Sequence, residues 1–340
     1  MLTKIFTSFG LNPADFKADP ITAGYINQTY KLSGKQAYVL QRVNKNVFTR
    51  PELIAGNLRI ASDYLSRHYS DYVFLSAVKT PAGQEMVYDE EGFPWRLFPF
   101  IENSITINKV DTEEEAYNAA SGFAQLTANL SGCDATVFKP TIDRFHDLAW
   151  RYAQFETALI RATYERKQEA QEAIENCQHF SYLVTEYNEL IASKKLQLRI
   201  THNDTKINNI LFDAKTRKAI CVIDLDTLMP GYFIYDVGDM VRTFVSPVDE
   251  EEKDLTKVQF REEIYTALVQ GYLSQMGDKL NDTEKTLFPF AGMMMTYIMA
   301  LRMLADFLNG NIYYQIKYPD HNLVRARNQL KLLSLLEKQT

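Results

Sequence analysis

The sequence has little cysteine, glycine or proline, and each shortage excludes a class of protein. Its 340 residues contain three cysteines, Cys133, Cys177 and Cys221, which are odd in number and far apart. This pattern gives neither a disulfide framework nor a metal-binding spacing, so we expect a reducing, cytoplasmic compartment. With 14 glycines, 11 prolines and no biased tract, the chain has the composition of an ordinary globular protein.

Positive charge and long hydrophobic runs are also scarce. The formal net charge is −6, which argues against a nucleic-acid partner or an anionic membrane surface. The N-terminus has no long apolar core of the signal-peptide type. The most apolar segment, 288–304, contains Pro289, Gly292 and Arg302 and is short for a membrane span. We therefore expect a buried core helix there and no membrane partner.

The expected secondary structure changes in character about a third of the way along the chain. Strands are predicted near 29–32, 37–43 and 95–100, where β-formers lie between turn residues. Thr49 and Glu52 fit a capping box at the start of one early helix. Beyond residue 108, apolar stripes predict helices at 112–131, 143–166, 167–193, 258–276, 283–309 and 320–337, interrupted by a strand–loop–strand segment at 198–226.

This order of elements predicts an α+β protein with two lobes. We place a strand-rich N-terminal lobe at 1–100, a connector at 101–108 and a mainly helical C-terminal lobe at 109–340. The length is sufficient for two lobes, because a single core stops growing well before this size. Small ligands usually bind in the cleft between lobes, so the active site is expected there.

One pair of motifs carries the chemistry. Residues 202–209 read His-Asn-Asp-Thr-Lys-Ile-Asn-Asn, and Asp224 ends the apolar run 219–223. Transfer of a nucleotide γ-phosphoryl group needs a carboxylate to orient the attacking hydroxyl, and oxygen ligands to hold Mg²⁺ against the phosphates. Asp204 fits the first role, while Asn209 and Asp224 fit the second. For Asp204 taken alone, a turn-capping role is the alternative.

The neighbours of these three residues have more ordinary explanations. Lys206 either neutralises charge on the transferring phosphoryl group or is a solvated lysine. His202 suits a structural role that fixes the shape of the loop. Asp226 is expected to be separated from Asp224 and is the less favoured metal ligand of the two. Asp236 suits a brace at a helix start. The acidic run 249–252 is expected to be a solvated face.

The nucleotide phosphates have no glycine-rich loop to bind. Neither Gly-x-Gly-x-x-Gly nor Gly-x-x-x-x-Gly-Lys-Ser/Thr occurs, and the hairpin at 24–30 has one glycine. Within that hairpin, Asn27 and Thr29 are the candidate nucleotide contacts. Arg42, on the strand 38–43, is the candidate fixed cation for the α/β-phosphates, and a surface arginine is the alternative. The early helix offers no acidic residue in its middle to pair with Arg42.

Polar and aromatic residues on and after the apolar helix predict an acceptor wall. Arg302 and Asp306 are four residues apart and share a helical face, and Tyr313 follows. A surface ion pair is the simpler explanation of the first two. Alternatively, bidentate, polar and aromatic groups together suit the hydroxyls and ring face of a sugar.

These residues resemble the aminoglycoside phosphotransferase and choline kinase superfamily, which is related to the protein kinases. The resemblance rests on His202-x-Asp204-x-x-x-x-Asn209 and Ile223-Asp224, and it covers essentially the whole chain. Within the superfamily, the chain is most similar to the N-acetylhexosamine 1-kinases, through the segments 24–30, 40–44, 224–231 and 306–313.

The resemblance implies a protein-kinase-like fold and a cytoplasmic kinase that uses ATP and Mg²⁺. Asp204 is then the base acting on the anomeric hydroxyl of N-acetylglucosamine or N-acetylgalactosamine, and Asn209 and Asp224 are metal ligands. Arg302 and Tyr313 are sugar contacts. Phe100 and Ile101, at the connector, lie where the adenine would bind.

Two other readings stay open. A choline- or aminoglycoside-type kinase would need aromatic cages or acidic walls for its cationic acceptor. A non-catalytic nucleotide-binding pseudokinase is suggested by the single-glycine hairpin, although such a protein has no need of Asp204. We expect a small-molecule sugar substrate and see no argument for a protein partner.

Overall fold

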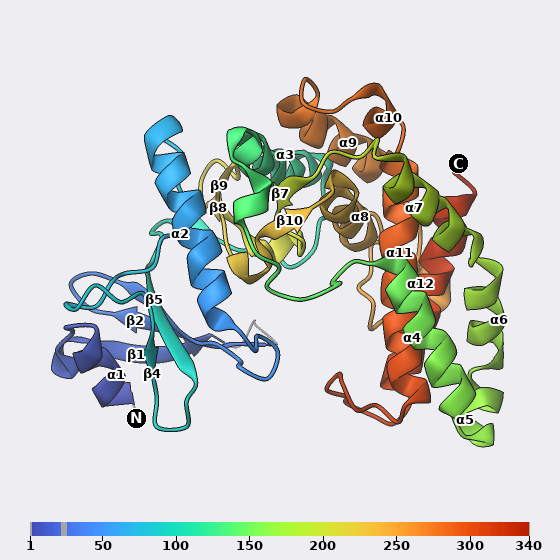
Figure 1. Ribbon diagram of the computed structural model, residues 1–340, viewed down its shortest axis with the longest axis horizontal. Helices are drawn as coiled ribbons and strands as arrows, with labels where there is room; N and C mark the ends of the chain where they lie inside the picture. The colour runs from blue at the N-terminus through green and yellow to red at the C-terminus, as the bar shows by residue number, and fades with distance from the viewer. Residues whose placement is uncertain (1, 22–25, 340) are drawn as a thin grey trace.

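The computed structural model describes residues 2–21 and 26–339. A five-stranded antiparallel sheet forms the N-terminal lobe, and the C-terminal lobe is mainly helical (Figure 1), as the sequence predicted. The strands lie in the order β1-β2-β3-β5-β4. Their bounds are β1 Lys17–Ile21, β2 Gln28–Ser33, β3 Tyr38–Arg42, β4 Val87–Tyr88 and β5 Pro94–Pro99, with α1 Leu2–Ser8 before them and α2 Pro51–His68 between β3 and β4.

The two faces of this sheet have different surroundings. One face is apolar, and its residues Leu32, Leu40, Trp95 and Leu97 pack against Ile5, Phe6 and Phe9 of the α1 region. Because side chains alternate along a strand, the neighbouring residues point the other way, toward the cleft. We call the first face the outer face and the second the inner face. Thr29, Gln41 and Arg96 occupy matching positions of β2, β3 and β5 on the inner face.

Helix α2 lies between the sheet and the larger lobe (Figure 1). Its apolar residues Ile54, Leu58, Ala61 and Leu65 are buried in the main core, at intervals of three or four residues that place them on one face of the helix. The predicted capping box is wrong. Arg50 is the N-cap residue and has no side-chain capping bond, and Pro51 begins the helix. Proline suits this first position because it has no backbone N–H to satisfy.

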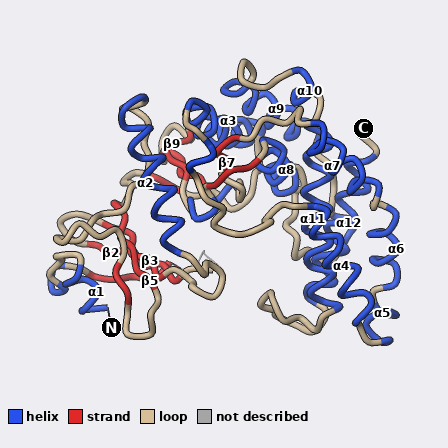
Figure 2. Tube along the Cα trace, viewed as in Figure 1, coloured by secondary structure: helices blue, strands red, loops and turns tan. Residues whose placement is uncertain are grey.

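The C-terminal lobe contains the remaining elements, which include two small sheets. Strand β6 of the connector pairs with β8, and β8 pairs with β9, while β7 pairs with β10. The strands β7 and β9 lie among the helices in Figure 2. The bounds are β6 Ser104–Ile105, α3 Glu113–Asn129, α4 Leu148–Arg161, α5 Tyr164–Glu169, α6 Gln171–His179, α7 Tyr182–Ser193, β7 Arg199–Thr201, β8 Ile210–Asp213, β9 Ala219–Val222, β10 Met229–Gly231, α8 Phe233–Phe244, α9 Glu262–Met276, α10 Asp282–Lys285, α11 Phe288–Leu308 and α12 His321–Glu337.

The predicted helix 167–193 is three shorter helices, α5, α6 and α7. Thr163 caps α5 by accepting a hydrogen bond from the backbone N–H of Arg166, so the break lies before the predicted start. Ala170 and Phe180 leave the helical conformation at the two later breaks. Changes of backbone conformation at Ala170 and Phe180 therefore divide a segment whose apolar periodicity alone suggested one helix.

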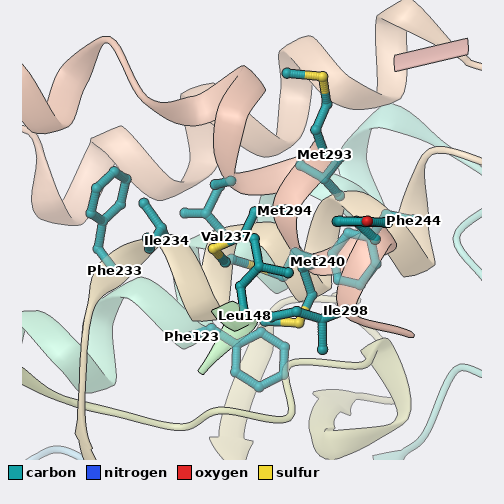
Figure 3. Close-up of a cluster of buried hydrophobic side chains, with 14 of the residues drawn as sticks. Phe123, Leu148, Phe233, Ile234, Val237, Met240, Phe244, Met293, Met294 and Ile298 are labelled. Atoms are coloured by element: carbon teal, nitrogen blue, oxygen red, sulfur yellow. The ribbon is translucent and has the colours of Figure 1, made fainter. Parts of the chain in front are cut away.

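Helix α11 is the core helix of the larger lobe. By length and composition it could cross a membrane, but 89% of its apolar window is buried inside the protein, which agrees with the core-helix prediction. Figure 3 shows side chains of α8 and α11 packed together above Phe123 of α3. This packing fixes α8, and with it the loop that α8 supports. The labelled residues of α8 and α11 are Phe233, Ile234, Val237, Met240, Phe244, Met293, Met294 and Ile298.

Candidate active site

The loop between β7 and β8 is held by the first turn of α8. Asp236, which is fully buried, accepts hydrogen bonds from the backbone N–H groups of His202 (3.1 Å) and Asn203 (2.7 Å). Thr205 Oγ1 donates to the Asp236 carbonyl at 2.7 Å. Asn203 has a positive φ of 66°, so the chain turns sharply just before Asp204. Asp236 is thus a structural brace, as predicted, but it braces the loop at residues 202–203 and not the free N–H groups at the start of its own helix.

The ring of His202 joins the two motif segments. Its Nε2 lies 2.9 Å from the carbonyl oxygen of Ile223, and its Nδ1 accepts from the backbone N–H of Asp204 at 3.2 Å. These partners require a neutral ring with the proton on Nε2. The predicted structural role of His202 is therefore confirmed, because one side chain sets the position of Asp204 relative to the strand end that carries Asp224.

Asp204 lies between an amide and an ammonium group. Asn209 Nδ2 donates to its Oδ2 at 2.9 Å, and Lys206 Nζ lies 3.0 Å from its Oδ1. Burial alone would raise the pKa of Asp204, but the charge and hydrogen bond of Lys206 outweigh it, so the pKa is lowered. Asp204 is thus a carboxylate at neutral pH, as a group that orients a hydroxyl and accepts its proton late must be.

Asp224 follows β9 in the left-handed conformation, with φ 56° and ψ 52°. Non-glycine residues rarely adopt this conformation, and it is common at functional sites. Its side chain is exposed at the loop surface. Partial desolvation by the surrounding protein and the charges of Asp226 and Asp204 raise the pKa of Asp224 to about 6. Mutually repelling carboxylates at one point fit a site that receives a cation.

Asn209 and Asp224 fit the proposed metal. The amide nitrogen of Asn209 donates to Asp204, which leaves the amide oxygen as its metal-binding atom. Within the described ranges, no three His, Cys, Asp or Glu side chains form a metal-binding cluster. A site of few protein ligands is typical of Mg²⁺, whose shell is completed by water and substrate phosphates.

Asp226 is held by the N-terminal lobe. Asn27 Nδ2 donates to its Oδ2 at 2.8 Å, and Arg96 Nη1 lies 2.5 Å from its Oδ1. The side chain is nearly fully buried. Asp226 therefore connects the two lobes directly beside Asp224. Asn27 contacts Asp226, and its nucleotide contact stays a prediction, whereas Gly24 and Tyr25 of the same hairpin are outside the described residues.

The prediction for Arg42 as a phosphate cation is corrected by the structure. Arg42 pairs on β5 with Trp95 and lies on the outer face. Its guanidinium contacts Asp89 at 2.7 Å and Glu91 at 2.5 Å, and it lies 3.8 Å from the centre of the Phe93 ring. The acidic partners thus come from the β4–β5 turn and not from the early helix.

The inner face carries a different cation, Arg96. Its Nε and Nη2 donate to Gln41 Oε1 at 3.1 Å and 2.9 Å, and Gln41 Nε2 donates to Thr29 Oγ1 at 3.2 Å. Sequence analysis missed Arg96. The available signal was a single arginine within the apolar strand Trp95–Phe98. Phe100 and Ile101 are half-buried where β5 meets the connector, and their adenine contact stays a prediction.

Arg302 lies beside the loop between β7 and β8, which carries Asp204. Its guanidinium lies 5.5 Å from the ring centre of Phe145 and 5.7 Å from that of Tyr314, and it makes no ion pair with the residues that the structure describes. His146 Nε2, 2.8 Å from the Asn203 carbonyl, connects this region to the loop. Burial, with the charges of Arg302 and Arg151, lowers the pKa of His146 to about 3.

Asp306 does not pair with Arg302, and its predicted role in binding substrate is corrected. Its two oxygens accept hydrogen bonds from the backbone N–H groups of residues 312–314 and from Asn322 Nδ2, at 2.8–3.0 Å. Asp306 thus shapes the connection between α11 and α12, which reaches toward the side of the N-terminal lobe (Figure 1). Tyr313 is 66% exposed on this connection, so its ring is accessible to a ligand.

A buried ionic network behind Lys206 was also missed from the sequence. Arg242 pairs with Asp239 at 2.8 Å and with Glu250 at 2.7 Å, and Arg325 contacts Glu250 as well. Glu250 had been expected to belong to a solvated face. Two arginine charges outweigh its burial and lower its pKa to about 2. The network fixes the charges around Lys206, which senses both Asp239 and Arg242.

The fold and this loop geometry define a protein-kinase-like phosphotransferase of small molecules. The sequence pattern of the phosphotransferase enzyme family, APH, matches residues 17–278. The chain belongs to this family.

Solved structures show the same fold at low identity. The chain is similar to an amicoumacin kinase solved with AMP-PNP and Ca²⁺ (14% identity, 97% of this chain and 92% of that chain, TM-score 0.66). It is also similar to a microcompartment-associated aminopropanol kinase (14%, 99% and 96%, 0.62). A third is choline kinase from Cryptosporidium parvum Iowa II (16%, 99% and 96%, 0.57).

Proposed function

We propose that this phosphotransferase transfers the γ-phosphoryl group of Mg²⁺-ATP to the anomeric hydroxyl of an N-acetylhexosamine, giving the sugar 1-phosphate. The observation that carries the choice of acceptor is the unpaired Arg302 beside the catalytic loop, between two aromatic rings. A fixed planar donor suits hydroxyl and acetamide oxygens. The exposed ring of Tyr313 can cover an apolar sugar face.

Asp204 would orient the hydroxyl and accept its proton as the bond to phosphorus forms. Lys206, 3.0 Å from that carboxylate, would neutralise charge on the transferring group. Mg²⁺ held by Asn209 and Asp224 would supply charge neutralisation at the nucleotide phosphates. The buried network of Arg242 and Glu250 would keep Lys206 in position without becoming part of the chemistry.

The charges around the acceptor site argue against a cationic substrate. Arg151 lies near Arg302, and burial followed by the Arg302 charge lowers the pKa of Arg151 to about 10. Two neighbouring arginines give the acceptor site a positive electrostatic potential, which would repel a choline or an aminoglycoside. The neighbouring solved structures are kinases of amino-bearing compounds by name, so the proposed acceptor differs from theirs.

An acceptor panel tests this proposal. Mg²⁺-ATP would be incubated with the full chain and N-acetylglucosamine, N-acetylgalactosamine, galactose, choline or an aminoglycoside, and ADP release followed. We expect release with an N-acetylhexosamine together with loss of the sugar's reducing end. Release only with a cationic acceptor would refute the sugar assignment and keep the phosphotransferase.

Arg302→Met and the exposed Arg161→Met form a matched pair in the same assay. We expect Arg302→Met to raise the KM for the sugar by about 10-fold or more, as for loss of a charged hydrogen bond, and to leave the KM for ATP within about 2-fold. Arg161→Met should change neither. Equal effects of the two variants on the sugar KM would show that Arg302 does not contact the acceptor.

A further inference from the structure

A row of polar side chains crosses three strands of the inner face and ends at Asp226, two residues after Asp224. Thr29, Gln41 and Arg96 are in register on β2, β3 and β5 and are joined by hydrogen bonds of 2.9–3.2 Å. Arg96 then reaches Asp226 at 2.5 Å. All five guanidinium N–H groups belong to one planar fork, so Gln41 on one side and Asp226 on the other hold Arg96 in a single orientation.

Strand β3 presents no cation to the inner face, where Val39 and Gln41 lie. Arg42 points to the outer face and is neutralised by Asp89 and Glu91. Its inner-face neighbour on the same strand is the neutral Gln41. Phosphoryl transfer places three or more negative phosphate charges against this wall, and a fixed cation is the usual means of binding them. The inner face therefore needs a cation from another strand.

The inner face carries the cations Lys31 on β2 and Arg96 on β5. Lys31 lies with its ammonium 3.8 Å above the Phe100 ring, beside the connector. Arg96 lies at the other end, against the loop that holds Asp224. The phosphates must reach Asp224, since its carboxylate would hold the metal that binds them. Arg96 is thus the cation on the path of the phosphates, whereas Lys31 lies beside the expected adenine.

The surroundings of Asp226 link Arg96 to Asn27, in the connection before β2. Asn27 comes from the connection before β2 and donates to the second oxygen of Asp226. Asn27 Oδ1 in turn accepts from the backbone N–H of Asn44 at 3.0 Å. The connection before β2, through Asn27, and strand β5, through Arg96, consequently meet at the carboxylate of Asp226, two residues after Asp224. Arg96 is 4% exposed, so its orientation is fixed before a nucleotide arrives.

We propose that Arg96 on β5, positioned by Gln41 and Asp226, is the residue that binds the α/β-phosphates of the nucleotide, in place of a cation on β3. This inference rests on the use of a nucleotide in the proposed function, and it is independent of the acceptor. Asp226 acts through Arg96 and is a positioning residue.

The test compares ligands with and without phosphates. ADP with Mg²⁺ and adenosine would be titrated into the full chain and into Arg96→Gln, Arg96→Lys and Arg42→Gln. We expect Arg96→Gln to weaken ADP binding about 10- to 100-fold, the range for a charged hydrogen bond, and adenosine binding less than about 2-fold. Arg96→Lys should recover part of the loss. Arg42→Gln should bind both ligands as the wild type does.

A variant that shows no selective loss of ADP binding overturns the proposal. ADP binding by Arg96→Gln that equals the wild type, or equal weakening of ADP and adenosine, would show that Arg96 only holds the lobes together. If Arg96→Gln does not fold, Gln41→Ala keeps the cation and removes its support, and it should weaken ADP several-fold more than adenosine. Equal effects there would again refute the proposal. Failure of the wild type to bind ADP would refute nucleotide use itself, whereas normal ADP binding without sugar turnover would affect only the acceptor assignment.

Discussion

The ammonium of Lys206 lies 3.0 Å from the carboxylate of Asp204. The two residues come from one short loop, so the structure places this carboxylate and a cation close together before any substrate binds. The pair has opposite effects on its members. It lowers the pKa of Asp204 despite burial, and the Asp204 charge raises the pKa of Lys206.

Lys206→Met should therefore change both the rate and its pH dependence. Without the Lys206 charge, burial raises the pKa of Asp204 and the carboxylate loses its proton at a higher pH. We expect kcat to fall about 10- to 100-fold, as when one group that stabilises charge in the transition state is removed. The acidic limb of the kcat–pH profile should also move to higher pH. A lower rate with an unmoved limb would show that Lys206 does not act on Asp204.

Binding of the metal nucleotide should depend on pH through Asp224. Its pKa of about 6 in the folded protein is above the ordinary value of 3.8. The stabilising contribution of this group is therefore fully present below pH 4 and is lost as the pH rises through 6. Metal binding needs the carboxylate form and releases the proton.

The corresponding measurement is calorimetry of Mg²⁺-ADP binding in buffers of different ionisation enthalpy. Release of about half a proton is expected at pH 6 and much less at pH 8, with affinity falling below pH 6. Asp224→Asn should abolish the release, and removal of Mg²⁺ by EDTA should weaken ADP binding. A wild-type protein that releases no proton at pH 6 would contradict the metal assignment of Asp224.

Asp236→Asn should disturb the loop between β7 and β8, although no substrate contact is proposed for Asp236. The amide has one acceptor oxygen where the carboxylate supplies two, and its NH₂ group faces a backbone N–H. We expect a loss of about 1–3 kcal/mol of unfolding free energy, the cost of a buried unsatisfied donor, together with reduced kcat. Asp278→Asn, at an exposed position, is the control in urea unfolding. Identical stability of the two variants would refute the bracing role.

Arg42→Gln should lower stability while nucleotide binding is retained. Asp89 is almost fully buried, and hydrogen bonds from Trp95, Phe93 and Arg42 overcome the effect of burial and lower its pKa to about 2. Removal of the guanidinium leaves this carboxylate without its cation, at a cost of about 3 kcal/mol.

The sign of the pH effect follows from the lowered pKa. Asp89 stabilises the fold above pH 4, and this contribution is lost as the pH falls toward 2. The difference in unfolding free energy between the wild type and Arg42→Gln should consequently be largest at neutral pH and shrink below pH 4. A difference that is independent of pH would show that the Arg42–Asp89 pair is not its source.

The catalytic loop could be predicted because its residues are close in sequence. Asp204, Lys206 and Asn209 lie within six positions, and one loop brings them together whatever surrounds it. The structural roles of His202 and Asp236 could also be predicted, but their partners could not, because His202 contacts Ile223 and Asp236 contacts residues 202 and 203, all distant in sequence.

The face of the sheet on which Arg42 lies depended on strand register, which the sequence did not settle. A shift of one residue moves a side chain to the opposite face of a sheet. Because Gln41 and Arg42 are adjacent on β3, they face opposite sides of the sheet, and the sequence alone does not show which of them faces the cleft. Only the pairing of β3 with β5 shows that Gln41 and Arg96 share the inner face while Arg42 lies with Trp95.

Long-range pairing explains the remaining differences. Helical spacing placed Arg302 and Asp306 on one face, but Asp306 is used by the backbone of 312–314 and by Asn322. Glu250 was expected in solvent and instead meets Arg242 and Arg325. In each case the partner of the carboxylate lies well outside its own helical turn, and no local sequence pattern predicts the contact.

The most direct test of the account is the rate of ADP formation from Mg²⁺-ATP and an N-acetylhexosamine by the wild type and Asp204→Asn. The product would be identified by phosphorus NMR, and ADP affinity measured in parallel. We predict a sugar 1-phosphate with the wild type and a rate about 10² to 10⁴ times lower with Asp204→Asn, the usual contribution of a general base, at nearly unchanged ADP affinity. Turnover by Asp204→Asn at the wild-type rate would contradict the central claim that Asp204 is the catalytic carboxylate.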